Sequence, residues 1–553
     1  MEKTSWLPKS FYCLRDYSWQ TFSKDLIAGV TVGLVALPLA MAFAISSGVP
    51  PQAGLATAIV AGFLSSLLGG SRAQVSGPTG AFVVVVAGIV AKYGTVGLHQ
   101  VTLLAGIMIL LLGVTGLGKA VQFIPRPVVL GFTNGIAILI ASTQLKDFFG
   151  LEAPKVPSEF MSRMVTLWDV RVSVHQSALL LGLGCLAVII LFRWLAPKVP
   201  GTILALFGGT IIALVLKLPV ETVGSRFGEI PRGLPPLQVP PLRLDLMGSL
   251  LGPALTVTML GSIESLLSAV VSDRMLKDRH NSNVELVGQG IANIISPLFG
   301  GLPSTGAIAR TATNVKSGAR TPVAGMIHAL VLLLIVLVAA PLAKYIPMSV
   351  LAAILLVVSY NMGEWKEIPD ILRVSRADAA VWAVTFLLTV FADLTVAVQA
   401  GMILAALLFI TRVASTTQVT EVSSEYVETG RDHILQDKSI PKGVRILRIQ
   451  GPFLFGTTAK LDDFHDKLAD MPPVVIVRLR NMTALDATGM KSLEDFADEV
   501  TRSGRHVLFC GAQEQPKRFM ERSGFPAHVG AENVCPNVDA ALARARELIP
   551  GVT

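Results

Sequence analysis

The chain contains fourteen apolar segments, each close to the length of a membrane-crossing helix. Such a helix needs roughly 20 predominantly apolar residues, and fewer where it is broken or shielded by protein. Only 15% of the residues are charged, whereas soluble domains carry about a quarter. We therefore expect a polytopic membrane protein with spans at residues 26–46, 51–70, 77–93, 100–119, 126–143, 175–195, 198–217, 250–272, 284–299, 304–318, 321–340, 347–361, 377–391 and 394–412.

Basic residues in the short loops predict the orientation of these spans. Cytoplasmic loops carry an excess of Lys and Arg. Most short-loop basic residues follow even-numbered spans, although Lys92 and the arginines of the 218–247 loop are exceptions. The pattern predicts that both termini are cytoplasmic, with residues 1–25 as a cytoplasmic N-terminal segment. The residues that follow even-numbered spans are Arg72, Lys119, Arg126, Arg193, Lys198, Arg274, Lys277, Arg279, Lys316, Arg320, Lys366, Arg373, Arg376 and Arg412.

An internal repeat divides the apolar region into two halves. The stretch "GLATAIVAGFLSSLLGG" at 54–70 is similar to "ELVGQGIANIISPLFGG" at 285–301, and "SGPTGA" at 76–81 is matched by "STGA" at 304–307. The second half therefore restarts at span eight, which gives repeats over about 26–217 and 250–413. Because each half has an odd number of spans, the halves lie upside down relative to each other. Inverted repeats with short, Gly/Pro-interrupted spans indicate a transporter site near the midplane.

The short segments of the repeat predict two helix starts that face one pocket. Ser76 or Gly77 is expected to cap one half-helix, with Pro78 in its first turn, and residues 304–306 are expected to do the same in the other half. Inversion points both N-termini, with their free amides and partial positive charge, toward one spot that suits an anion. The alternative, two loops between ordinary helices, leaves the shared position in both repeats unexplained.

Four ordered motifs resemble one family of anion transporters. These are "LVALPLAMAFAISSGVPPQAGL", "GPTGAF", "IESLLSAVVSD" and "ARTATNVKSGARTP". With them the chain resembles the SulP family, the bacterial relatives of the solute carrier 26 proteins, over essentially its whole length. The resemblance implies a fourteen-span, 7+7 inverted repeat with core and gate domains, residing in the inner (plasma) membrane. It also implies a homodimer and an elevator-type movement of the anion site.

Glu264 in the middle of span eight is the expected coupling residue. An ionisable residue at that depth costs about 2.5–3.5 kcal/mol on insertion scales, so it is functional by default. Ser265 is adjacent, and Ser268 lies one turn along on the same face. The resemblance places this carboxylate beside the anion site. Sodium-coupled relatives, the cyanobacterial bicarbonate transporters, have Asp here and Thr at the position of Ile308. Because burial favours a neutral carboxyl group, we expect proton symport, with a purely structural Glu as the alternative.

The resemblance implies two further site residues, Arg310 and Leu39, and the position of Phe82 after the first turn of the half-helix predicts a third. The resemblance places the basic Arg310 behind the anion site, where it either adds positive potential or pairs with a carboxylate. Leu39 stands where many relatives carry Gln, which makes the pocket wall more apolar, and Phe82 either walls the pocket or packs in the core. The expected substrate-binding residues are Leu39, Ser76, Gly77, Pro78, Thr79, Gly80, Ala81, Phe82, Ser304, Thr305, Gly306, Ala307 and Ile308.

The C-terminal part predicts a separate α/β domain. The transport domain is expected over 26–413, a polar linker over 414–430, and alternating strands and amphipathic helices over 431–553. The motif "LDATG" is similar to that of STAS domains, and Thr488 falls where anti-sigma-factor antagonists carry a phosphorylated residue. Regulation by phosphorylation and a cytoplasmic partner of this domain are therefore hypotheses. The alternative is that Asp486, Thr488 and Gly489 only shape and cap the loop.

These features favour a secondary active transporter. The four cysteines lack metal-like spacing, and neither a Walker loop nor a catalytic triad occurs in the sequence, so we expect no metal, no cofactor and no enzyme activity. No nucleic-acid partner is expected. The leading hypothesis is proton-coupled transport of sulfate or bicarbonate. A C4-dicarboxylate or nucleobase transporter of the same fold, and a membrane sensor that signals through the STAS domain, are the alternatives.

Overall fold

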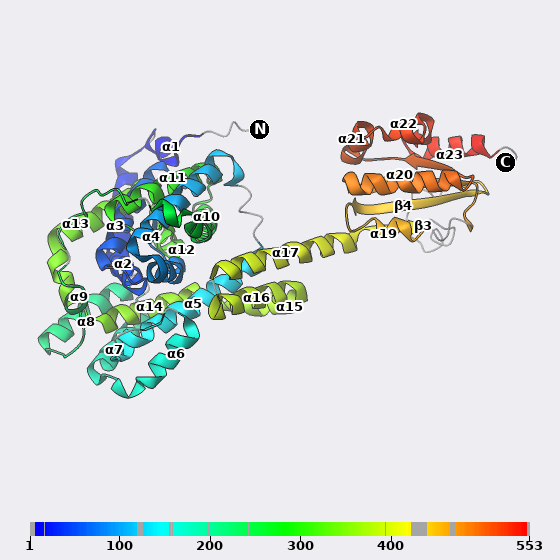
Figure 1. The fold of residues 1–553 in the computed structure, drawn as a ribbon. Coiled ribbons are helices and arrows are strands. Elements are labelled where there is room, and N and C mark those ends of the chain that lie inside the picture. Colours follow the sequence, from blue (N-terminus) through cyan, green and yellow to red (C-terminus); the bar gives the residue numbers. More distant parts are fainter. Residues whose placement is uncertain are drawn as a thin grey trace. The chain divides into compact units, whose positions relative to one another are not determined.

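A computed structural model describes residues 6–549 except 16, 119–124, 154–155, 158, 197–199, 230, 242, 393, 422–439 and 465–469. The chain forms two compact units, Met1–Ile403 and Leu404–Thr553 (Figure 1). The first unit is helical, and the second contains a five-stranded sheet with helices. In the described part of the chain, nine helices are long and apolar enough to cross a membrane by themselves.

The helices of the first unit pack as two groups. The core group consists of α2 (Trp19–Ser46), α3 (Pro51–Leu68), α4 (Gly80–Val114), α10 (Met247–Leu276), α11 (Ser282–Ile295), α12 (Ile308–Lys316) and α13 (Val323–Ala339). The gate group consists of α5 (Arg126–Phe149), α7 (Gln176–Leu195), α8 (Gly201–Val215), α14 (Met348–Met362) and α16 (Arg376–Phe391). Helix α17 (Leu394–Thr416) contains the boundary between the two units. Smaller helices are α1 (Lys9–Arg15), α6 (Phe160–Asp169), α9 (Val223–Phe227) and α15 (Ile368–Val374).

Each of the fourteen predicted segments contains helix, but the helices do not all match single spans. The third and fourth segments lie within α4, which is interrupted at Gly94, where φ is 69° and ψ is −174°. Glycine adopts this conformation without the steric cost of a side chain. Several helices, α12 among them, are too short to cross a bilayer unaided. Such short segments are tolerated at membrane depth where protein surrounds them.

A two-stranded pairing joins the two repeats. Strand β1 (Ser76–Gly77) pairs antiparallel with β2 (Thr305–Gly306), so that Ser76 lies opposite Gly306 and Gly77 opposite Thr305. Antiparallel pairing of equivalent segments is what an inverted repeat predicts. Each strand immediately precedes a helix, α4 or α12, and the pairing therefore brings the two helix starts together.

The predicted caps of these two helices are wrong. The N-cap of α4 is Thr79 and that of α12 is Ala307, and neither uses a side chain to cap. Ser76 and Gly77 are instead part of the strand pair, and Ser76 Oγ donates to Gln289 Oε1 at 3.1 Å. Pro78 accordingly precedes α4 rather than occupying its first turn. Residues 304–306 also lie before α12: β2 takes up the backbone of Thr305 and Gly306, and the Ser304 amide donates to Asn293 Oδ1 at 2.8 Å.

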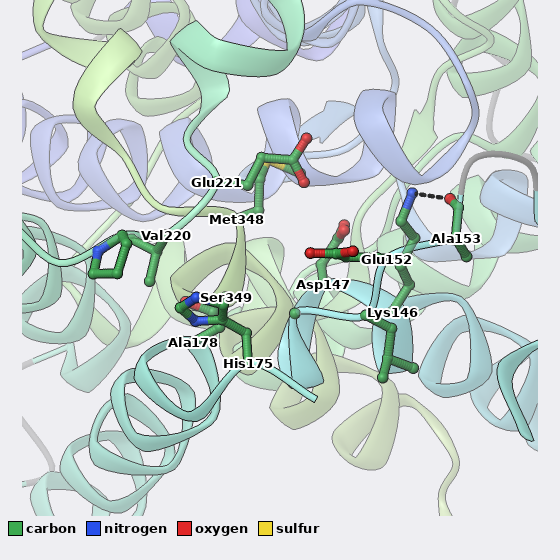
Figure 2. Close-up of a pocket in the computed structure, with 13 residues that line it drawn as sticks. Lys146, Asp147, Glu152, Ala153, His175, Ala178, Val220, Glu221, Met348 and Ser349 are labelled. Carbon is green, nitrogen blue, oxygen red and sulfur yellow. Dashed lines mark hydrogen bonds between the residues drawn. The ribbon is translucent and has the colours of Figure 1, made fainter. Parts of the chain in front are cut away.

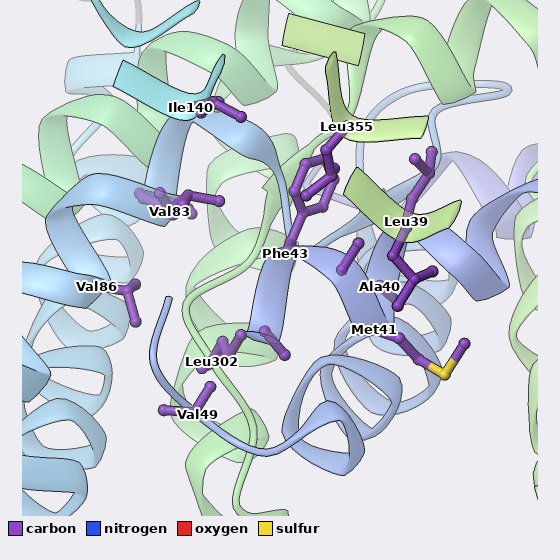
Figure 3. Packing of buried hydrophobic residues seen from close by; sticks show 14 of the residues in the cluster. Leu39, Ala40, Met41, Phe43, Val49, Val83, Val86, Ile140, Leu302 and Leu355 are labelled. Carbon is purple, nitrogen blue, oxygen red and sulfur yellow. The ribbon is translucent and has the colours of Figure 1, made fainter. Parts of the chain in front are cut away.

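A large apolar cluster fills the first unit where the groups meet. It includes Leu39 and Phe43 of α2, Val83 of α4, Ile140 of α5 and Leu355 of α14, all buried (Figure 3). Both groups contribute to it, which accounts for the compactness of a unit built from two helix groups. Figure 3 labels Phe43 of α2 and Leu355 of α14 as members of this cluster.

The second unit is a mixed sheet with helices on both faces. Its strand order is β3-β4-β5-β6-β7, with β3 antiparallel to β4 and the other neighbours parallel. Two separate apolar clusters form, one containing residues of α20 and the other residues of α23. The strands are β3 (Gln418–Glu421), β4 (Val444–Phe453), β5 (Val474–Leu485), β6 (His506–Cys510) and β7 (Val534–Cys535), and the helices are α19 (Ala459–Asp462), α20 (Ala487–Arg502), α21 (Glu514–Arg522), α22 (Phe525–Val529) and α23 (Val538–Leu548).

The structure corrects the predicted linker. Residues 418–421 lie within the predicted 414–430 linker, yet they form the edge strand β3 beside β4. The polar sequence suits this position because an edge strand is partly exposed and its backbone is paired on one side only. The remaining predicted linker, 422–430, lies outside the described residues.

Candidate functional site

A cavity of about 340 Å³ lies where the starts of α4 and α12 meet. We call it the central cavity. Helices α2 and α10 of the core group complete its wall, and α5 and α14 of the gate group face them. It is therefore a site between the two groups, and much of its lining is apolar. The predicted site residues that line it are Leu39, Thr79, Gly80, Glu264, Ala307, Ile308 and Arg310.

The other predicted substrate-binding residues surround the central cavity without lining it. Those of β1 and β2 are in the strand pair. Ser304 is buried, and its hydroxyl accepts from Gln289 Nε2 at 2.8 Å. Phe82 is in the apolar cluster, so the packing alternative is the one that the structure supports. Those outside the lining are Ser76, Gly77, Pro78, Ala81, Phe82, Ser304, Thr305 and Gly306.

Both helix starts present backbone amides near the cavity. The first amides of an α-helix have no partner within the helix, and neither Thr79 nor Ala307 supplies a side-chain cap. Each start also carries the positive end of a helix dipole. Thr79 and Gly80 from α4 and Ala307 and Ile308 from α12 line one wall together. This geometry suits a small anion.

From the core group, one basic and one acidic side chain reach the central cavity. Arg310, in the first turn of α12, is only 3% exposed, and its Nη2 donates to the Pro78 carbonyl at 2.5 Å. Its Nη1 is buried and has no hydrogen-bond partner among the described residues. Glu264 on α10 accepts a hydrogen bond from Thr79 Oγ1 at 3.1 Å. The cavity thus holds one charge of each sign beside the two helix starts.

Ser265 and Ser268 lie behind Glu264 and fasten α10 to the second half-helix. Ser265 Oγ lies 3.0 Å from Thr305 Oγ1 and accepts from the Gly306 amide at 3.1 Å. Ser268 Oγ lies 2.8 Å from Thr311 Oγ1. Both serines are fully buried outside the cavity lining. Their contacts fix α10 against β2 and α12, and thereby the position of Glu264.

Sequence reasoning missed the polar residues that the gate group adds to the cavity. These are Thr133 on α5, Asn361 on α14 and Glu364 just after α14. Asn361 Oδ1 accepts from Arg193 Nη1 of α7 at 3.0 Å. Periodicity alone gave no signal for them, because their position in the cavity depends on how the gate group packs against the core group.

A larger pocket, of about 660 Å³, lies elsewhere in the first unit and contains none of the predicted site residues (Figure 2). Lys146 at its edge donates to the Ala153 carbonyl at 2.7 Å. Arg226 binds both Asp147, at 2.6 Å, and Glu221, which line it. The hydrogen bond from Arg226 holds the pKa of Glu221 below its ordinary value. Arg226 is therefore neutralised by these two carboxylates, and the pocket lies apart from the starts of α4 and α12.

The second unit has an ordinary helix cap at the predicted regulatory motif. Asp486 is the N-cap of α20 and accepts from the Gly489 amide at 2.8 Å and from the Phe455 amide at 3.0 Å. Thr488 is exposed in the first turn. Capping by Asp486 agrees with the loop-shaping alternative, whereas phosphorylation of Thr488 stays a prediction. Within the described ranges, no group of three or more potential metal ligands occurs.

The fold and the cavity define the class of protein: a polytopic helical membrane transporter with a C-terminal STAS domain. Residues 22–385 match the sulfate permease family, and residues 436–541 match the STAS domain. The chain therefore belongs to the sulfate permease family.

Two relatives illustrate this membership, and one solved structure shows a similar fold. YvdB of Bacillus subtilis, provisionally named a sulfate transporter, is 41% identical and covers 94% of this chain and 97% of its own. Bicarbonate transporter BicA of Synechocystis is 34% identical, covering 90% of each chain. Murine Solute Carrier 26 family member A9, an anion transporter in the inward-facing state, superposes with a TM-score of 0.85 at 19% identity, covering 98% of this chain and 94% of that one. This last similarity supports the fold alone.

Proposed function

We propose that the chain is a secondary active transporter that carries a small inorganic anion, sulfate or bicarbonate, across the inner (plasma) membrane. The observation that carries this proposal is the meeting of two uncapped helix starts beside Arg310 in one cavity. Free amides and a cation there compensate the charge of a desolvated anion. Family membership and the names of relatives support the two substrates.

Glu264 is the proposed coupling group. Its carboxylate lies in the same cavity as Arg310 and contacts Thr79 at the start of α4. An anion bound at the helix starts is repelled by an ionised Glu264, so uptake of a proton by this group favours uptake of the anion. We propose proton symport on this basis, by an elevator-type movement of the core group, with both termini cytoplasmic.

Uptake into proteoliposomes tests the proposal. Purified protein is reconstituted and supplied with labelled sulfate, bicarbonate or fumarate under an imposed proton or sodium gradient. We expect concentrative uptake of sulfate or bicarbonate that depends on the proton gradient. Uptake of fumarate alone would identify the protein as a dicarboxylate transporter. Dependence on the sodium gradient alone would contradict the role of Glu264 in proton coupling. Binding without uptake would favour a membrane sensor.

A homodimer and a cytoplasmic partner of the STAS domain complete the proposal. Light scattering of the purified full-length protein in detergent measures the number of chains, for which we expect two. Capture experiments with a variant that lacks residues 431–553 test whether a partner requires this domain.

A further inference from the structure

Glu364 places a carboxylate at the gate side of the central cavity. It follows α14 and lines the cavity together with Asn361, and both residues are exposed. Leu39 and Arg310, which line the same cavity, are buried. The exposed pair therefore marks the mouth through which water reaches the buried helix starts. An anion moving from solvent to Arg310 passes this carboxylate.

The backbone of Glu364 is strained. Its φ is 41° and its ψ is 38°, and it is one of three non-glycine residues with positive φ in the part of the chain that the structure describes. A left-handed residue just after a helix is usually glycine, because a side chain there is sterically disfavoured. Gly363, directly before it, has an ordinary φ of −69°. Strained residues of this kind cluster at functional sites, and this one lies at a cavity.

The charge of Glu364 is not offset by a direct partner. Of the described residues, none forms a hydrogen bond or ion pair with its carboxylate, and its charged neighbours Arg126 and Glu367 bind each other at 2.5 Å. Arg193 approaches the mouth from α7 and is bound to Asn361. Deeper in the cavity lie Arg310 and Glu264, whose side chains are of opposite charge type.

We propose that Glu364 is a specificity-determining residue that weakens the capture of anions in proportion to their charge. This inference rests on the proposed function of the central cavity. The Coulomb energy between Glu364 and an anion doubles when the anion carries two charges instead of one. The factor by which Glu364 lowers the capture rate of a divalent anion is therefore the square of the factor for a monovalent anion. Glu364 thus favours bicarbonate over sulfate.

The variant Glu364→Gln tests this charge filter. It keeps the shape of the side chain and removes the charge. Because the loop after α14 is predicted to be cytoplasmic, kcat/KM for labelled sulfate and bicarbonate is measured in proteoliposomes whose protein turns its cytoplasmic face toward the labelled anion, with the opposite orientation as the comparison. At low ionic strength we expect kcat/KM to rise about threefold for bicarbonate and about tenfold for sulfate, with smaller gains at high salt. If the wild-type protein carries only one of these anions, the factor for that anion decides.

Three further variants separate charge from backbone strain and from general surface effects. Glu364→Gly removes both charge and strain, and we expect it to match Glu364→Gln in transport without a fall in melting temperature. Asp370→Asn neutralises an exposed carboxylate on α15 outside the cavity lining, and it should leave both rates unchanged. Arg193→Gln should shift the rates in the opposite direction.

The outcomes distinguish the filter from the proposed function. The role of Glu364 would be overturned, while anion transport stands, by any of four results. Glu364→Gln could leave kcat/KM unchanged, lower it, or raise it by the same factor for both anions. The effect could also be confined to Glu364→Gly. A wild-type protein that carries neither anion would overturn the proposed function, and the filter with it.

Discussion

The substitution Gly77→Ala tests whether Arg310 acts through its position in the wall of the central cavity. Gly77 is in β1 and does not line the cavity, and its φ of 150° is one that residues with a side chain rarely adopt. A Cβ atom there would lie 2.8 Å from Arg310 Nη1, closer than real Cβ contacts allow, and 3.4 Å from the Cα of Ala58. The guanidinium must therefore move, although its Nη2 is bound to the Pro78 carbonyl.

The magnitude follows from the contacts that are lost. Losing a hydrogen bond from a charged group costs about 1.5–3 kcal/mol, and the strained backbone costs about 1–3 kcal/mol. If the lost hydrogen bond weakens the binding of the anion by this amount, kcat/KM for uptake decreases about 10- to 150-fold, since about 1.4 kcal/mol is a factor of ten. The second cost should appear as a lower melting temperature of the purified protein.

Uptake into proteoliposomes measures the effect, with Gly88→Ala as the matched control. Gly88 lies in the part of α4 that precedes the interruption at Gly94, and a Cβ atom there meets nothing within 4 Å. The double variant Gly77→Ala with Arg310→Gln should be no slower than Arg310→Gln alone, because both changes act through one guanidinium. Full additivity, or normal uptake in Gly77→Ala, would refute the role that we assign to Arg310.

Three other predictions concern coupling and the STAS domain. Glu264→Gln keeps an acceptor for Thr79 but cannot ionise, so we expect uptake that no longer responds to an imposed proton gradient; intact concentrative, pH-dependent uptake would contradict proton coupling. Asp486→Ala removes the N-cap of α20 and should lower the free energy of unfolding of this domain by about 1–2 kcal/mol, seen as faster hydrogen exchange in α20, whereas Thr488→Ala should change it little. Burial raises the pKa of the Cys510 thiol from 9.0 to about 12. The unfolded thiol therefore ionises first, and the free energy of unfolding should fall as the pH rises from 9 toward 12. Cys510→Ala should make this slope smaller, and an unchanged slope would show that other groups are responsible.

The meeting of two helix starts at one cavity could be predicted from the sequence, because the inverted repeat implies it. Similar segments in inverted halves must approach each other, and Thr79, Gly80, Ala307 and Ile308 do line one cavity. The caps were wrong because β1 and β2 are short and far apart in the chain. Strands of two residues are too short to show the alternation of apolar and polar residues that identifies a strand. A Ser next to a Pro is as typical of a helix N-cap as of such a strand.

The gate side of the cavity was beyond sequence reasoning. Thr133, Asn361 and Glu364 occupy no shared motif, and they reach the cavity only through the packing of α5 and α14 against the core group. The strain at Glu364 is likewise invisible in a sequence, since a Glu after a helix is ordinary until its backbone angles are known. The strand at 418–421 was missed because its residues are polar on an edge that needs few apolar contacts.

The pairing of β1 with β2 has a mechanical consequence. Two backbone segments from opposite repeats pair directly before the helices α4 and α12 begin. Ser265 of α10 accepts a hydrogen bond from the Gly306 amide in the same strand pair. Neither start can slide independently without breaking these hydrogen bonds. If the core group moved past the gate group, the two helix starts and α10 would therefore move as one rigid body. An anion bound at the helix starts would keep its core-group ligands, and only the gate-group residues around it would change.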